Sequence, residues 1–470
     1  MAHINYQTKD KSQLPEGGIL KTRAIYNDKI LADYRGNPLI EALPPELSSS
    51  EMTSMLEHLP AFNPRDREAS AADRLDMTRR LLRLFIALPQ HRSLARTIHG
   101  AMRDGYSGRN PATPGFYRYS RKRVITMMQN MGLKLDPSLS GFGLSDDEET
   151  VVRTAEELFT STHGFHFIGL SGMGKSTALR KILSRYPQVL LHDVYKGNPC
   201  SFQQVTWLHL ECPSDGRLNG LCERFFQALD EILGSSYYSW AVRNGRQMPQ
   251  HLMIPVMAHL AQLHGLGLLV IDEVQRLSES RSGGHLQMLN FFTELQNTIH
   301  VPIVLVGTPT ATDVLNDKFR LTRRGCSQGE VLWNRMKEDR SWHEFLDALW
   351  QYQYTSKVSP LGLDWGLKDA TGRKLPPVPS RLSHVIYDET QGIVHLVVIL
   401  YMLAQARAIR SGREVVDEST IKSVAFDSFG SAQKAIRALR EGNKKALAEI
   451  GDLSFDGLAM HANEKRRKAA

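Results

Sequence analysis

The sequence has few cysteines, and their spacing excludes two classes of small, cross-linked fold. Its 470 residues include only four cysteines, and no two of them form a C-x-x-C pair. Disulfide scaffolds and zinc ribbons need denser and more regularly spaced cysteines, so this pattern favours a reducing compartment. The four residues are Cys200, Cys212, Cys222 and Cys326.

Long hydrophobic runs are also lacking. The longest, residues 393–403, has 11 residues and includes His395, whereas a membrane-spanning helix needs about 20. Residues 1–18 are polar and lack the apolar stretch of a secretory signal. The sequence therefore predicts a buried helix rather than a membrane span, and a cytoplasmic location.

The composition is otherwise that of an ordinary folded protein. Hydrophobic residues make up 41% and charged residues 23%, close to the globular average, and the length suits two to four structural units. Lys and Arg number 58 against 50 Asp and Glu, a net charge of +8. This excess is compatible with a nucleic-acid partner, but many proteins without one share it.

Residues 1–145 predict an N-terminal arm followed by a helical region. About the first 60 residues are rich in turn formers, so we expect an extended arm that packs on another part of the chain. Apolar residues at helical spacing predict a helix over 70–88, ended by Pro89, and a second helix over 93–103. Residues 105–111 (GYSGRNP) predict a loop.

Residues 146–338 predict an α/β core, because short β-rich runs alternate with helical ones. We expect a parallel sheet of about five strands, at residues 165–168, 205–210, 268–271, 303–306 and 331–333, with helices at 176–184, 218–233, 253–264 and 286–298. Residues 339–445 predict an all-helical unit, with helices at 342–352, 380–387, 393–409 and 419–429. Residues 446–470 predict a short basic tail.

A phosphate-binding loop follows the first strand of the core. Residues 169–176 (GLSGMGKS) match G-x-x-x-x-G-K-[ST] between an apolar strand and a helix. Such glycines let main-chain N–H groups surround phosphates, and the helix N-terminus adds partial positive charge. We expect Lys175 to reach the phosphates of ATP and Ser176 to hold Mg²⁺. The predicted nucleotide contacts are Gly169, Leu170, Ser171, Gly172, Met173, Gly174, Lys175, Ser176 and Thr177.

Two acids end a later strand, in residues 268–273 (LLVIDE). Ligands of parallel α/β sheets bind outside the carboxyl ends of the strands. We expect Asp272 to position the water shell of Mg²⁺ and Glu273 to polarise the attacking water. The pattern is common at solvated turns, but together with the phosphate loop it indicates nucleotide hydrolysis.

Two further features favour phosphoryl transfer. Thr308 ends the strand at 303–306 and is expected either to contact the γ-phosphate or the attacking water, or to be an ordinary turn hydroxyl. Three arginines lie near the end of the α/β unit, and one of them is a candidate arginine finger from a neighbouring subunit. The alternative is a solvated or DNA-facing patch. The candidates are Arg320, Arg323 and Arg324.

These motifs together resemble an AAA+ ATPase, with a five-stranded P-loop core and a helical lid. Three longer segments resemble signatures of the TnsC/TniB-type ATPases, the ATP-dependent regulators of cut-and-paste transposons with dedicated target selectors. The first is 34–45 (YRGNPLIEALPP) and the second is 105–111. The third combines 268–278 (LLVIDEVQRLS), 280–284 (SRSGG) and 288–292 (MLNFF). Where many AAA+ initiators place a nucleotide-contacting arginine in the lid, this chain has His395, which we expect to be a packed helix residue.

The resemblance implies a homo-oligomeric ring or filament on double-stranded DNA, with ATP and Mg²⁺ between subunits. It further implies that the assembly links a target-selector protein to the transposase and is reset by ATP hydrolysis. Phosphate contacts from basic residues would make DNA affinity sequence-tolerant and dependent on salt. Candidate DNA contacts, each of which is otherwise a solvated charge, are Arg217, Arg281, Arg118, Arg121, Lys122 and Arg123.

Two alternatives share the same core. The chain could be a replication-initiator or helicase-loader ATPase, against which the 34–45 and 105–111 segments argue. It could also be a signalling or remodelling ATPase without a DNA partner, which a DNA-stimulated ATPase assay would distinguish.

Overall fold

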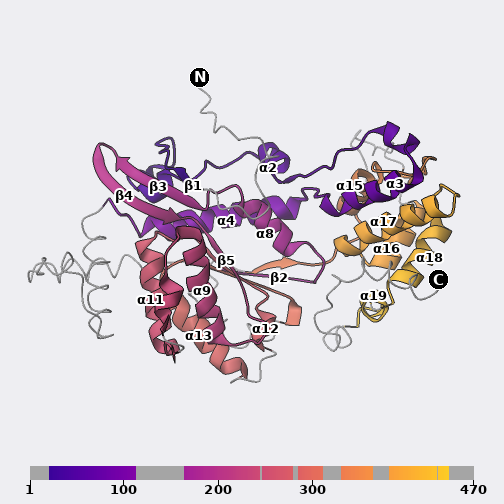
Figure 1. The fold of residues 1–470 in the computed structure, drawn as a ribbon. Helices are drawn as coiled ribbons and strands as arrows, with labels where there is room; N and C mark the ends of the chain where they lie inside the picture. The colour runs from indigo at the N-terminus through magenta and orange to yellow at the C-terminus, as the bar shows by residue number, and fades with distance from the viewer. Residues whose placement is uncertain are drawn as a thin grey trace, which may run out of the picture.

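The computed structural model describes residues 21–112, 164–243, 246–278, 284–310, 330–363, 380–430 and 432–443. Figure 1 shows an α/β unit joined to a group of helices formed by the later part of the chain.

A five-stranded parallel sheet forms the centre of the α/β unit. Its strand order is β10-β2-β9-β8-β5, and every neighbouring pair is parallel. The strands are β2 (Phe165–Gly169), β5 (Leu208–Glu211), β8 (Leu269–Asp272), β9 (Ile303–Gly307) and β10 (Glu330–Trp333). The predicted α/β class and five-stranded parallel sheet are thus confirmed.

Successive side chains of the central strands face two separate hydrophobic clusters. Ile303 and Leu305 pack into one cluster, while Val304 and Val306 pack into the other. Because helices cover both faces, β9 is apolar along its whole length instead of alternating with polar residues, and β2 and β8 are apolar except for His166 and Asp272. The helices α9 (Leu218–Leu233), α11 (Gln250–Leu263) and α13 (Gly284–Ile299) cover the first face, and α8 (Lys175–Leu183) and α4 (Pro89–Ser107) cover the second.

A second sheet of three strands was not predicted. It contains β1 (Lys21–Arg23), β3 (Val189–Tyr195) and β4 (Asn198–Val205) in the order β1-β3-β4. The β3–β4 hairpin turns at Lys196 and Gly197, whose φ angles are 50° and 83°, as a two-residue turn with both residues left-handed requires. Because β4 ends at Val205 and β5 begins only at Leu208, the single strand expected over 205–210 is wrong at its start.

The N-terminal region divides between the two parts of the molecule. The short helix α1 (Pro38–Glu41) packs on α4, and α2 (Ser49–Leu56) contacts both α4 and α8. The chain then crosses to the helical part as a strap, which we define as η2 (Pro64–Glu68), α3 (Ala71–Thr78) and η3 (Arg79–Arg83). Both α3 and η3 pack against α17 (Val394–Arg410) before α4 returns to the α/β unit.

The helix expected over 70–88 is wrong beyond Thr78. The α-helix gives way to the 3₁₀ turn of η3, and Phe85 then forms an isolated bridge with His58. Pro89 does not end a helix; it begins α4, because the missing N–H of proline is harmless in the first turn. The loop expected over 105–111 starts late, since α4 continues to Ser107.

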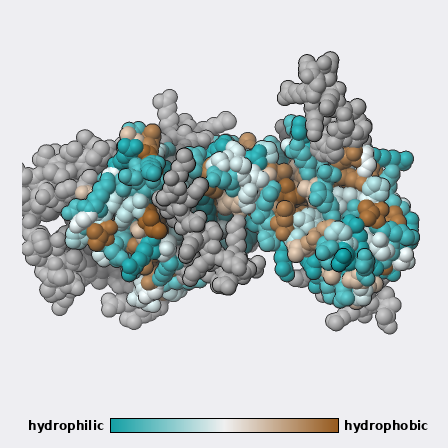
Figure 2. All heavy atoms as spheres, turned by 90° about the horizontal axis from the view of Figure 1, so that it is seen from above, coloured by the Kyte–Doolittle hydropathy of each residue, from teal (hydrophilic) through white to brown (hydrophobic). Residues whose placement is uncertain are grey.

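Among the residues that the structure describes, the helical part contains α17 and four further helices around it. These are α15 (Arg340–Trp350), α16 (Arg381–Thr390), α18 (Glu418–Ser428) and α19 (Gln433–Arg440), of which α19 was not predicted. Among the described residues, one window, Val394–Ser411, is apolar and long enough to cross a membrane, but 67% of it is buried in the structure. This burial is what the core helix of a helical unit requires. On the face drawn in Figure 2 the described surface is mostly hydrophilic, with separate small apolar patches.

A buried ion pair fastens the strap to the helical part. Arg74 donates from Nη1 to Glu414 Oε2 at 2.7 Å and from Nη2 to Oε1 at 2.8 Å, and it also donates to the carbonyl of Tyr354 at 3.0 Å. The side chains of Arg74 and Glu414 are only 7% and 13% exposed. Glu414 accepts a further hydrogen bond from the N–H of Ser356 at 2.9 Å, so the carboxylate is satisfied on both sides.

Removing Arg74 should therefore destabilise the protein. We expect Arg74→Ala to lower the free energy of unfolding by about 3 kcal/mol, because it leaves a buried carboxylate without its cation. The matched control is Arg413→Ala, which removes an exposed pair with Asp417 and should cost less than about 1 kcal/mol. Denaturant unfolding of both variants is the measurement, and equal losses would contradict the structural role of the strap.

Buried histidines should make stability depend on pH. Burial lowers the pKa of five histidines from 6.5, to about 3 for His99 and to about 4 for His91, His166, His192 and His264. Above pH 6.5 these groups are neutral in both the folded and unfolded states. As the pH falls from 6.5 towards 4, the unfolded chain binds more protons, so the free energy of unfolding should decrease.

Unfolding measured at several pH values between 4 and 7 tests this expectation. The variant His264→Gln should reduce the slope of stability against pH by about one proton. A stability that does not vary between pH 6.5 and 4 would contradict the burial of these rings.

Candidate nucleotide site

The phosphate loop connects the end of β2 to the start of α8. Gly172 and Gly174 adopt φ angles of 76° and 81°, a left-handed conformation that residues with a side chain rarely adopt. Lys175 begins α8, and its Nζ donates to the carbonyls of Gly169 at 2.6 Å and Leu170 at 3.1 Å. The lysine therefore lies folded over its own loop, where a phosphate group would offer it stronger acceptors.

The two predicted magnesium ligands lie together. Ser176 Oγ donates to Asp272 Oδ2 at 2.8 Å, although 96 positions of sequence separate them. Burial alone would raise the pKa of Asp272, but hydrogen bonds from His209, Ser176 and the N–H of Glu273 outweigh it, so the pKa lies below its usual value. An ionised carboxylate beside a hydroxyl is a donor set that suits Mg²⁺.

His209 was missed by sequence reasoning. It lies on β5, and its Nε2 is 3.4 Å from Asp272 Oδ2, the oxygen that also accepts from Ser176. Its register partner on β8 is Val270, two residues before the acid. Only the pairing of β5 with β8 shows this proximity, since the motif around residue 272 contains no histidine.

Glu273 follows the end of β8 in an unusual backbone conformation. Its φ angle is 60°, which costs a residue with a side chain roughly 1–3 kcal/mol and tends to occur at functional sites. Its Oε2 accepts a hydrogen bond from Gln275 Nε2 at 2.9 Å and lies 3.5 Å from Arg276 Nε. The carboxylate of the predicted catalytic residue is thus held by two neighbours of its own turn.

Thr308 lies just beyond β9, close to the same edge of the sheet. Its N–H donates to Gln275 Oε1 at 3.3 Å, and its Oγ1 is 2.8 Å from Thr310 Oγ1. The residue is 5% exposed. The structure therefore brings Thr308 and Glu273 to the same side chain, and a contact between Thr308 and the γ-phosphate stays a prediction.

The helical part of the chain closes on the phosphate loop. The N–H of His395, in the first turn of α17, donates to the carbonyl of Gly172 at 3.0 Å. Met173 packs into the hydrophobic cluster of the helical part, with Leu170 against it. Gly392, just before α17, packs against the main chain of Met336. A Cβ at position 392 would lie 2.2 Å from the carbonyl oxygen of Met336.

Several predicted site residues lie outside the described residues. These are the finger candidates Arg320, Arg323 and Arg324 and the DNA candidates Arg281, Arg118, Arg121, Lys122 and Arg123. Arg217 is described: it precedes α9, and its Nε lies 3.5 Å from Asp215 Oδ2 with the side chain 73% exposed. It is accessible, and its contact with DNA stays a prediction.

The segments 34–45 and 105–111 meet each other in the structure. Asn37 Nδ2 donates to the carbonyl of Tyr106 at 2.8 Å, and Asn110 Nδ2 donates to the carbonyl of Gly36 at 2.9 Å. Arg109 is buried and donates to the carbonyls of Gly105 and Leu266, at 2.7 and 2.8 Å. The two segments therefore bind each other, and the bond from Arg109 to Leu266 holds them on the α/β unit.

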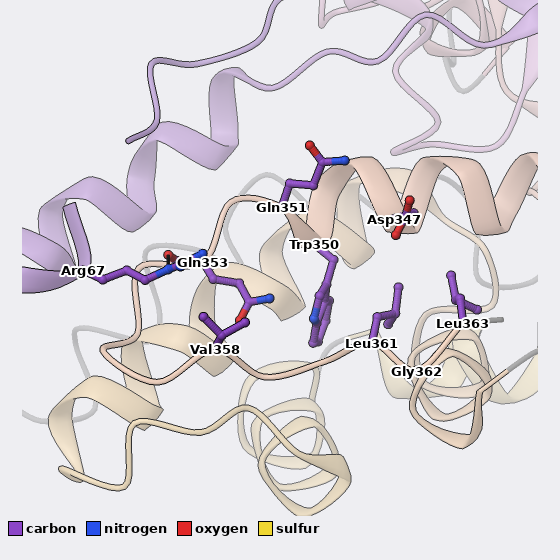
Figure 3. Close-up of a pocket in the computed structure, with 9 residues that line it drawn as sticks. All are labelled: Arg67, Asp347, Trp350, Gln351, Gln353, Val358, Leu361, Gly362 and Leu363. Carbon is purple, nitrogen blue, oxygen red and sulfur yellow. Dashed lines mark hydrogen bonds between the residues drawn. The ribbon is translucent and has the colours of Figure 1, made fainter. Parts of the chain in front are cut away.

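A cavity of about 460 Å³ lies between the strap and the helical part, away from these motifs. Figure 3 shows Trp350 and Leu361 at its wall, with Arg67 of η2 at one end. Arg67 Nε donates to the carbonyl of Gln353, and Trp350 Nε1 donates to the carbonyl of Ser359. No phosphate-loop residue lines this cavity.

Comparison with known proteins finds a similarity in the core. A family model described as an AAA domain matches residues 163–315, a range that contains the phosphate loop and the two acids Asp272 and Glu273. No curated protein matches the chain.

Two solved structures are similar to this chain over much of its length. The Walker-type ATPase PABY2304 of Pyrococcus abyssi is 16% identical, with a TM-score of 0.34, over 64% of this chain and 77% of that one. A structure of Drosophila ORC bound to DNA is 10% identical, with a TM-score of 0.32, over 67% of each chain.

Lys175 should be essential for nucleotide binding. We expect Lys175→Ala to abolish binding of a fluorescent ATP analogue, because the phosphate loop loses its mobile cation. The control Lys181→Ala removes a lysine from the last turn of the same helix and should bind normally. Unchanged affinity in Lys175→Ala would contradict the assignment of the site.

Proposed function

We propose that this protein is an ATP-dependent regulator of DNA transposition. It binds and hydrolyses ATP, assembles on duplex DNA, and connects a target-selector protein to the transposase. The observation that supports ATP hydrolysis is the convergence of Lys175, Ser176, Asp272 and Glu273 at one edge of the sheet. The resemblance of 34–45, 105–111 and 268–292 to TnsC/TniB-type ATPases supports the role in transposition.

ATP and Mg²⁺ are the cofactors of this proposal. Lys175 and the loop N–H groups bind phosphates, while Ser176 and Asp272 hold the metal and its water shell. Glu273 polarises the water that attacks the γ-phosphate, and an arginine among Arg320, Arg323 and Arg324 completes the site from a neighbouring subunit. A ligand bound between subunits stabilises the assembly by mass action, so ATP favours the oligomer and hydrolysis resets it.

The organisation of the chain follows from the same proposal. The ATPase core spans 146–338 and the helical lid spans 339–445, with the N-terminal region at 1–145 and a basic tail at 446–470. The lid contacts the phosphate loop through His395 and Gly172, so its position can respond to what the loop binds. DNA is held through its phosphates, since a regulator that accepts sites chosen by another protein cannot depend on base sequence.

The variant Glu273→Gln separates ATP binding from hydrolysis. It keeps the shape of the side chain and removes its charge, so we expect normal ATP affinity and turnover reduced by about 10²-fold or more. On duplex DNA the variant should form longer-lived assemblies than the wild-type protein. Wild-type turnover in Glu273→Gln would refute the catalytic role of this residue.

Salt dependence tests how DNA is bound. Each neutralised phosphate adds about 0.9 to the slope of log affinity against log salt. Arg217→Ala should flatten this slope equally for unrelated duplexes, with ATP affinity unchanged, whereas the control Arg340→Ala, in the lid pair with Glu344, should not. A preference for one sequence favours an initiator-type ATPase, and an ATPase insensitive to DNA favours a signalling enzyme; either result would refute the proposal.

A further inference from the structure

We propose that Gln275 is a positioning residue that couples Thr308 to the carboxylate of Glu273. Its side-chain amide lies between the two: Nε2 donates to Glu273 Oε2 at 2.9 Å, and Oε1 accepts from the N–H of Thr308 at 3.3 Å. The inference rests on the proposed function, because it assigns to Gln275 the task of orienting the residue that acts on water.

The chemistry of the two partners suits an amide at this position. A main-chain N–H can only donate, and an ionised carboxylate can only accept. A glutamine offers one acceptor and two donors on a single planar group, so it satisfies both partners at once. The same requirement sets the orientation of the amide, with Oε1 towards Thr308 and Nε2 towards Glu273.

Burial strengthens the two hydrogen bonds of the Gln275 amide. Gln275 is 3% exposed, so water competes little for its amide, and its hydrogen bonds are stronger than on the surface. A main-chain hydrogen bond connects the same two segments: the N–H of Val274 donates to the carbonyl of Val306 at 3.0 Å. Movement of the β9 end is thus transmitted to the turn that carries Glu273.

Glu273 is sensitive to such movement. Its left-handed backbone, with φ at 60°, is maintained only by the contacts around it. Arg276 Nε lies 3.5 Å from the same Oε2 that Gln275 contacts, and Arg276 Nη1 lies 3.8 Å from Glu211. The carboxylate is held between a neutral donor connected to Thr308 and a cation connected to the end of β5. We infer that Gln275 sets the direction of the carboxylate according to the position of Thr308.

The test is the variant Gln275→Leu, with Gln262→Leu as its matched control. Gln262 is also a buried glutamine, 2% exposed, but neither of its side-chain polar atoms has a hydrogen-bond partner among the described residues. We expect Gln275→Leu to lower kcat by about 10²-fold, as a misplaced catalytic group does, with the Kd for ATP unchanged. Gln262→Leu should keep the wild-type kcat.

A second variant and a double variant separate positioning from folding. Gln275→Met keeps the length of the side chain but removes the amide that contacts Glu273 and Thr308, so it should lower kcat while leaving ATP affinity and the unfolding temperature close to those of Gln262→Leu. In the Glu273→Gln background, Gln275→Leu should not reduce the residual single-turnover rate further, because the group that it orients is gone.

The outcomes also separate this inference from the proposed function. Full turnover in Glu273→Gln would show that Glu273 is not the catalytic residue, and it would refute the proposed mechanism of hydrolysis. If Glu273→Gln is inactive but Gln275→Leu and Gln275→Met turn over like Gln262→Leu, only the coupling is refuted. An equal loss from Gln275→Leu in both backgrounds refutes it too, because such additivity means an effect independent of Glu273.

Discussion

The hydrogen bond between Ser176 and Asp272 depends on the parallel arrangement of β2, β9 and β8. Because these strands run in the same direction, their carboxyl ends meet at one edge of the sheet. The phosphate loop leaves β2 there, Asp272 ends β8, and Thr308 follows β9. Such a sheet must be covered by helices on both faces, which explains why its central strands are mostly apolar. The core and the site are consequences of the same topology.

Two sets of contacts position the helical part relative to the rest of the molecule. The strap binds it through Arg74 and Glu414, and the phosphate loop binds it through Gly172 and His395. The strap is part of the N-terminal region, which is also fastened to the α/β unit by the hydrogen bond from Arg109 to the carbonyl of Leu266. A rearrangement of the phosphate loop therefore acts on a helical unit that the strap also restrains.

The segments that carry the family resemblance have two different structural roles. Asn37 donates to the carbonyl of Tyr106 and joins the first two segments, and Arg109 donates to the carbonyl of Leu266 and attaches them to the α/β unit. The segment around Glu273 belongs to the site itself, where Gln275 connects it to the neighbouring strand. A resemblance in the first two segments is thus a resemblance in architecture, whereas the third concerns chemistry.

The sequence by itself determined the strands, the phosphate loop and the two acids, because local periodicity and motif spacing encode them. It did not reveal the β3–β4 hairpin, whose polar residues obscure the alternation, or the end of the helix beyond Thr78. Only the tertiary structure placed His209 beside Asp272 and Gln275 between Glu273 and Thr308. Strand register and the direction of a buried amide depend on contacts between distant segments, and no local pattern specifies them.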